Sequence, residues 1–189
     1  LAYAGLRKIS VGRAGGGVSR ILLNDRFVFQ LGPLDQGFWP DGLYAAPSDD
    51  ALRFDVELTK RYGFNMARKH VKVEPARWYH WCDRLGLLVW QDMPSGAGPA
   101  PWPEDGTEIG RTPSSRAQYR RELEAIVRGL RNHPSIVAWI PFNEGWGQFE
   151  TEETTARVRA LDPTRLVIAA SGGNDFGVGD AHDIHVYTG

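Results

Sequence analysis

The stretch that decides the fold is NHPSIVAWIPFNEGWGQ, residues 132–148. Its short apolar run, residues 136–140, leads without a break into Asn143 and Glu144. An apolar run of this length, bounded by turn signals, indicates a strand that is buried on both faces. In parallel α/β folds the reactive groups gather where strands end. The carboxylate of Glu144, beside an amide and the indole of Trp146, is therefore the first candidate for chemistry.

Strand and helix patterns alternate on both sides of this stretch. The chain begins with a predicted strand over residues 6–11, followed by a hairpin that turns at Asn24 and Asp25. Further strands are predicted over residues 64–68, 87–94, 136–140, 165–171 and 183–187. Repeated strand–helix units favour an α/β fold with a parallel sheet, which an open doubly wound sheet and a (β/α)8 barrel satisfy equally well.

The helices between these strands carry recognisable end signals and apolar stripes. Ser48 is a predicted N-cap, and the stripe of that helix is Ala51, Phe54, Leu58 and Tyr62. A second helix is predicted from Pro75 to Gly86. The clearest stripe is that of the third helix, formed by Tyr119, Leu123, Ile126, Val127 and Leu130. The Gly- and Pro-rich segment over residues 95–113 is too long for an ordinary connection, which indicates a functional loop.

Composition excludes several classes of protein. Lys and Arg number 22 and Asp and Glu number 23, so no nucleic-acid-binding surface is indicated. A single cysteine, Cys82, allows no disulfide within the chain. No apolar run approaches the ~18 residues of a membrane span, and no Gly-rich phosphate loop follows a strand. We therefore expect neither a cofactor nor a membrane partner, while compartment and oligomeric state are left open.

Five segments spread along the chain carry a resemblance to a known family. They are LNDRFVFQLG (23–32), GFNMARKH (63–70), CDRLGLLVWQDMP (82–94), NHPSIVAWIPFNEGWG (132–147) and DIHVYTG (183–189). Together they resemble the catalytic domain of glycoside hydrolase family 2, which includes β-galactosidases, β-glucuronidases and β-mannosidases. The loop PLDQGFWPDGLYAA, residues 33–46, departs from the Arg- and His-bearing loop of the better known members. The resemblance thus specifies a reaction type and leaves the sugar open.

The resemblance implies an α/β fold of the (β/α)8 TIM barrel type, here incomplete and comprising the first six strands. Residues 1–20 resemble the end of a preceding β-sandwich domain with its linker, and residues 21–189 the partial barrel. By analogy Glu144 is the general acid/base of a retaining mechanism. The nucleophilic glutamate is expected at the seventh strand, beyond residue 189. We therefore expect a β-glycoside as the substrate of the full-length protein and an inactive isolated chain.

Two carboxyl groups are the minimum for this chemistry, because one protonates the leaving oxygen while the other acts as nucleophile or base. Burial and a neighbouring nucleophile are expected to raise the pKa of Glu144, so that it rests protonated. The amide of Asn143 can donate to the sugar 2-hydroxyl. Tyr187 resembles the tyrosine that hydrogen-bonds the nucleophile. His185 and Tyr187 alternate with Ile184 and Val186, so they share one face of the predicted strand and are candidates for substrate binding.

Other candidate substrate-binding residues have equally plain structural roles. His70 either binds substrate or pairs with a carboxylate such as Asp92. Asp92 itself either binds substrate or forms an ion pair with Arg68 or Lys69. The remaining candidates are aromatic platforms for sugar faces, and these are Trp39, Trp102 and Trp146.

Two alternative functions remain open at this point. One is a non-catalytic module, a truncated barrel that only binds carbohydrate or a partner. The other is a metal-dependent barrel hydrolase, in which His182 and His185 join Asp92 or Asp180. Two histidines three residues apart on a strand point to opposite faces, which argues against the second. We accordingly predict no metal ligands.

Overall fold

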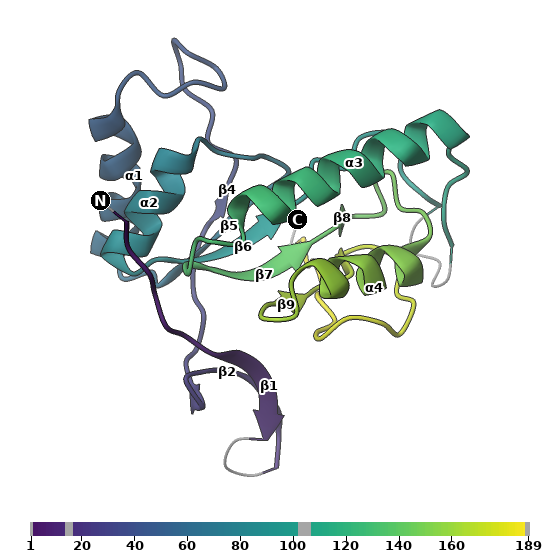
Figure 1. The fold of residues 1–189 in the computed structure, drawn as a ribbon, viewed down its shortest axis with the longest axis horizontal. Coiled ribbons are helices and arrows are strands. Elements are labelled where there is room, and N and C mark those ends of the chain that lie inside the picture. The colour runs from purple at the N-terminus through teal and green to yellow at the C-terminus, as the bar shows by residue number, and fades with distance from the viewer. Residues whose placement is uncertain (1, 14–16, 102–106, 188–189) are drawn as a thin grey trace.

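The computed structural model describes residues 2–13, 17–101 and 107–187. Its centre is a parallel five-stranded sheet whose strands lie in chain order (Figure 1). The strands are β4 (Leu34–Asp35), β5 (Met66–Lys69), β6 (Leu88–Asp92), β7 (Ile136–Ile140) and β9 (Leu166–Val167). A doubly wound sheet would reverse its strand order at a switch point. The progressive order therefore supports the barrel-type arrangement over the open sheet.

Strand β7 is buried along its whole length, as the apolar run predicts. Beyond it the chain forms β8 (Phe142–Asn143), which pairs in parallel with β10 (Ala170–Ser171). The strand predicted over residues 165–171 is thus divided into β9 and β10. These two short strands extend the neighbouring β7 and β9 toward the edge of the sheet where the strands end.

Four helices cover one face of the sheet (Figure 1). They are α1 (Asp49–Arg61), α2 (Ala76–Leu85), α3 (Pro113–Leu130) and α4 (Thr151–Leu161). All four contribute buried residues to one apolar cluster, together with strand residues such as Val89 and Trp139. A second cluster, which includes Val137 and Ile140, contains no helix residue and lies on the other face. None of the helices within the described residues has the length and apolar character that crossing a membrane requires.

The sixth predicted strand, residues 183–187, contributes to none of the described sheets. A strand requires a ladder of backbone bonds to a neighbour. Residues 183–187 are joined to the segment after β10 by one described backbone hydrogen bond, from the Gly172 N–H to the Asp183 carbonyl at 3.1 Å. Ile184 and Val186 are largely exposed. The prediction of a strand at this place was therefore wrong, although the segment lies next to β10.

The N-terminal residues form a separate antiparallel sheet of β1 (Ile9–Arg13), β2 (Ser19–Leu23) and β3 (Arg26–Phe27). Its hairpin turns at Asn24 and Asp25, both with positive φ, which confirms the predicted turn. Ile9 is buried in the second apolar cluster. The proposed domain boundary after residue 20 lies within β2. The origin of residues 1–20 in a sandwich domain stays a prediction.

Helix α1 is rotated relative to its predicted orientation. Ser48 caps it as predicted, by accepting a hydrogen bond from the Ala51 N–H. Its buried residues are Leu52 and Val56, whereas Phe54, which the predicted stripe placed in the core, is 49% exposed. The helix has apolar residues on two adjacent faces, and the face with Leu52 and Val56 packs into the apolar cluster that α1 shares with α2.

We predict that Leu52→Ala lowers the free energy of unfolding by about 2–5 kcal/mol, because it leaves a cavity in the core. Phe54→Ala on the same helix should cost about 1 kcal/mol or less. Urea denaturation of the two variants compares them directly. A larger loss for Phe54→Ala would restore the predicted stripe and contradict the rotation described above.

Candidate active site

Glu144 lies where β8 ends, at the edge of the sheet formed by the C-terminal ends of the strands. Its backbone N–H donates to the Ser171 carbonyl at 2.8 Å. Its φ of 50° lies in the left-handed region, which few residues other than glycine adopt. Backbone strain of this kind is concentrated at functional sites, where neighbouring contacts hold it. The Glu144 side chain is 31% exposed and hence accessible to a small molecule.

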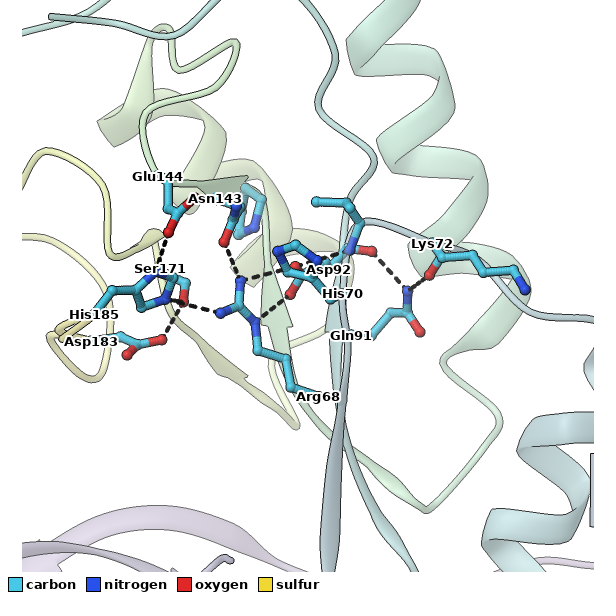
Figure 2. A network of polar contacts seen from close by, with 12 residues as sticks. Arg68, His70, Lys72, Gln91, Asp92, Asn143, Glu144, Ser171, Asp183 and His185 are labelled. Atoms are coloured by element: carbon cyan, nitrogen blue, oxygen red, sulfur yellow. Dashed lines mark hydrogen bonds and ion pairs between the residues drawn. The ribbon is translucent and has the colours of Figure 1, made fainter. Parts of the chain in front are cut away.

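The carboxylate of Glu144 has two hydrogen-bond partners on residues 183–187. Its Oε1 accepts a hydrogen bond from the Tyr187 hydroxyl. The same oxygen lies 2.8 Å from Nδ1 of His185 (Figure 2). Tyr187 thus contacts Glu144, whereas the resemblance assigned it to the nucleophile.

The pKa of Glu144 is lowered, contrary to the expected elevation. Burial is the largest single effect and raises the pKa, but the hydrogen bonds from Tyr187 and His185, together with the charge effects of His185 and His70, lower it overall. The expectation counted burial and the charge of the nucleophile but left out the donors on residues 183–187. In the part of the chain that the structure describes, the elevation is therefore not found, and the contribution of a nucleophile beyond residue 189 stays a prediction. Within the described residues, Glu144 therefore favours its ionised form.

Arg68, at the third position of β5, connects three of the predicted site residues, which are Asp92, Asn143 and His185 (Figure 2). Its guanidinium forms two hydrogen bonds to Asp92, of 3.0 and 2.9 Å. It also donates to Oδ1 of Asn143 at 2.7 Å, and its Nη1 lies 3.1 Å from Nε2 of His185. From the sequence, Arg68 is predicted only as an ion-pair partner of Asp92. Its position at the end of a predicted strand, next to the strand that ends in Asp92, was the signal for a larger role.

Asp92 is almost fully buried beneath this guanidinium, with its side chain 1% exposed. Both of its oxygens bind Arg68, and the Val71 N–H also donates to one of them at 3.1 Å. Of the two roles considered for Asp92, the ion pair with Arg68 accounts for these contacts.

His70 follows β5 directly, and its ring lies close to the side-chain amides of Gln36 and Asn143. Its Nδ1 lies 3.1 Å from the Gln36 side-chain nitrogen, and the imidazole also bonds to Asn143. The pKa of His70 is lowered, mainly because burial disfavours its charged form and despite the opposing charge of Asp92. His70 therefore favours its neutral form.

Ser171 and Gly172 hold His185 against the end of β10. The Ser171 hydroxyl donates to Asp183 and lies 2.9 Å from Nε2 of His185. A Cβ at Gly172 would come within 2.3 Å of the His185 ring, so only glycine allows this approach. Ser171 and Asp183 are site residues that the sequence analysis missed.

Two cavities meet at Glu144. The first, of about 750 Å³, faces Arg68, Trp90, His185 and Tyr187, and the second, of about 410 Å³, faces Val71, Pro94 and Trp146. Glu144 and His70 line both. A carboxyl group at such a junction can exchange a proton with an atom that joins two parts of one ligand.

The predicted aromatic platforms have different positions. Trp146 is 48% exposed and lines the second cavity. Trp39 lines neither of the two cavities, because it packs against the apolar core and its backbone pairs with Leu43. Trp102 lies outside the described residues. The structure thus brings Trp146 to the site and leaves Trp39 away from it.

The two histidines of the metal-dependent alternative have separate partners. His182 pairs with Asp175 at 3.4 Å, and His185 pairs with Glu144. Across residues 2–13, 17–101 and 107–187, no three His, Cys, Asp or Glu side chains gather into a possible metal site.

We predict that Tyr187→Phe raises the pKa of Glu144, because it removes a donor that favours the carboxylate. Carboxyl-carbon NMR titration measures this shift, with Tyr44→Phe as the matched control. A lowered pKa contributes stability that is complete above the ordinary value of 4.5 and is lost as the pH falls through the folded-state pKa. The unfolding free energies of the wild-type protein and Tyr187→Phe should therefore differ most at neutral pH and converge in acid. An unchanged Glu144 pKa would contradict this hydrogen bond.

We also predict that Arg68→Met lowers the free energy of unfolding by about 3–5 kcal/mol, because it leaves the Asp92 carboxylate buried without its partner. Adding Asp92→Leu should recover much of this loss, since both charges are then absent. The control is Arg128→Met, which removes an exposed pair with Glu124 and should cost about 0.5 kcal/mol or less. Chemical denaturation at pH 7 measures all four proteins. No recovery in the double variant would show that the Asp92 charge is not the cause.

Comparison with known proteins gives consistent matches. Residues 45–186 match the family model described as glycosyl hydrolases family 2, TIM barrel domain. Beta-mannosidase B from Emericella nidulans is 36% identical over 91 residues, which are 48% of this chain and 10% of that protein. A putative beta-glucuronidase from Formosa agariphila is 29% identical over 140 residues, which cover 66% of this chain and 15% of that protein.

Solved structures of the same kind share the fold. The beta-galacturonidase from Eisenbergiella tayi has a TM-score of 0.72 at 24% identity, over 89% of this chain and 29% of that one. Bacteroides uniformis beta-glucuronidase 3 has a TM-score of 0.65 at 26% identity, over 87% of this chain and 21% of that one. The chain thus spans less than a third of each of these relatives. The match over residues 45–186 shows that it belongs to glycoside hydrolase family 2 and carries part of the TIM barrel domain of that family.

Proposed function

We propose that residues 1–189 belong to a longer retaining β-glycosidase in which Glu144 is the general acid/base. The observation that carries the proposal is the position of the Glu144 carboxyl group at the C-terminal edge of the sheet, where two cavities meet. The named relatives, a beta-mannosidase and a putative beta-glucuronidase, support a β-glycoside as substrate.

In this proposal the reaction has two steps. A second carboxylate, supplied outside residues 1–189, attacks the anomeric carbon while Glu144 transfers its proton to the leaving oxygen. Glu144 then accepts a proton from the water that hydrolyses the glycosyl–enzyme intermediate. The negative charge of that nucleophile would raise the pKa of Glu144 and oppose the donors Tyr187 and His185. The acid role thus depends on the complete barrel, and the isolated chain should not turn over glycosides.

Asn143 is proposed to bind the sugar 2-hydroxyl. Arg68 donates to the amide oxygen of Asn143 at 2.7 Å. The amide NH2 is consequently the group that can donate to a substrate hydroxyl. Such a hydrogen bond strengthens as charge develops in the transition state. His70 and His185, which lie beside Asn143 and Glu144, are proposed as further contacts to sugar hydroxyls.

The proposal is tested with Glu144→Ala in the full-length protein, on the sugar that a screen of nitrophenyl glycosides identifies. A sugar leaving group needs protonation, so kcat/KM for that substrate should fall about 10²–10⁴-fold. A dinitrophenyl group departs without help, so its release should be almost unaffected while hydrolysis of the intermediate stalls. Azide should restore turnover and yield the β-glycosyl azide, since it needs no general base.

Two outcomes would contradict the assignment. Equal losses for both leaving groups without rescue by azide would remove Glu144 as the acid/base. Absence of turnover on every glycoside by the wild-type full-length protein would favour the non-catalytic alternative, a barrel that only binds carbohydrate. Isothermal titration with the same sugars would then measure that binding.

A further inference from the structure

The second cavity differs in character from the first. Its volume of about 410 Å³ lies in the range of pockets that bind small molecules. Val71, Pro94 and Trp146 give it apolar walls, while Asn143 and Glu144 stand at its border. The first cavity combines apolar residues such as Leu34 and Ile184 with the guanidinium of Arg68 and the imidazole of His185. His70 lines both cavities. The first cavity is therefore better suited to a ligand rich in hydroxyls, and the second cavity to the apolar face of a ligand.

The backbone around Trp146 is held by several hydrogen bonds. The Trp146 N–H donates to the Asn143 carbonyl at 2.9 Å. The Gly145 carbonyl accepts from the N–H of residue 100, and the Gly147 N–H donates to the carbonyl of residue 98, each at 2.8 Å. Arg111 donates to the Gly147 carbonyl at 3.0 Å. The indole is nevertheless 48% exposed. A large aromatic ring on a fixed backbone forms a contact surface that loses little entropy when a ligand binds.

The opposite wall contains a strained residue. Val71 has a φ of 45°, a conformation that is an outlier for a β-branched side chain. Its N–H is bound by the buried Asp92 carboxylate at 3.1 Å, which helps to hold the conformation. Such strain is retained where the surrounding structure fixes a site. Val71 lines the same cavity as Trp146, so the apolar surfaces of both belong to one site.

We infer that the second cavity binds the leaving group, and that the Trp146 indole packs against the apolar face of its six-membered ring. This inference rests on the proposed function. A general acid must lie between the transferred sugar and the group that departs, and Glu144 lies between the two cavities. The first cavity, which has the larger share of polar groups, then holds the transferred sugar, and the more apolar second cavity holds the leaving ring, whether sugar or aryl. Trp146 is thereby a specificity-determining residue.

The test compares three substrates of one sugar in the full-length protein: the glycosyl fluoride, the nitrophenyl glycoside and a disaccharide. Fluoride has no ring to pack against Trp146. Trp146→Ala should therefore lower the ratio of kcat/KM for either ring-bearing substrate to that for the fluoride by about tenfold. Trp146→Phe should recover part of the ratio, because it retains an aromatic face. The two ring-bearing substrates separate an aryl preference from a sugar preference.

The matched control is Trp81→Ala, which removes an indole that packs between α1 and α2 away from both cavities. Its three kcat/KM values should change in proportion and leave the ratios unaltered. An unchanged ratio in Trp146→Ala, with turnover preserved or lost equally on all three substrates, overturns the leaving-group assignment alone. No turnover of any of the three by the wild-type protein overturns the proposed function and this inference together.

Discussion

Arg68 and Asp92 form the buried ion pair on which the arrangement of the site depends. Taking two charges out of water is costly, and only close geometry with further hydrogen bonds offsets the cost. Here the guanidinium binds both carboxylate oxygens and also reaches Asn143 and His185 (Figure 2). One side chain of β5 thus orients groups from β6, from β8 and from residues 183–187. The pair contributes geometry that a well-packed apolar pair of the same volume would not provide.

The loop over residues 95–113 supports the catalytic candidate from outside. Four residues between 144 and 150 have positive φ, an unusual density that needs external restraint. Arg111 lies against the rings of Tyr119 and Phe149 and binds carbonyls from both segments. Glu108 binds the backbone N–H of Glu150 and so caps the start of α4. The described parts of this loop, residues 95–101 and 107–112, thus hold the turn that carries Glu144.

The protonation of Glu144 is a balance between burial and donors. Burial favours the neutral acid, and the Tyr187 hydroxyl and the His185 ring favour the carboxylate. Both donors come from residues 183–187, which are joined to the sheet mainly through side chains. Glu144 also lines both cavities, so its carboxyl group is accessible from each of them. In the proposed mechanism this position would link substrate preference to proton transfer.

The features that depend on local pattern could be predicted from the sequence. The short apolar run over residues 136–140, bounded by turn signals, indicated a buried strand, and the turn at Asn24 and Asp25 needed residues that tolerate positive φ. The motif around Glu144 placed that carboxylate at a strand end. Tertiary structure alone decided which of two apolar faces of α1 is buried, that residues 183–187 join no sheet, and that Arg68 connects the site. Periodicity and spacing report on neighbours along the chain, whereas these three features depend on contacts between segments tens of residues apart.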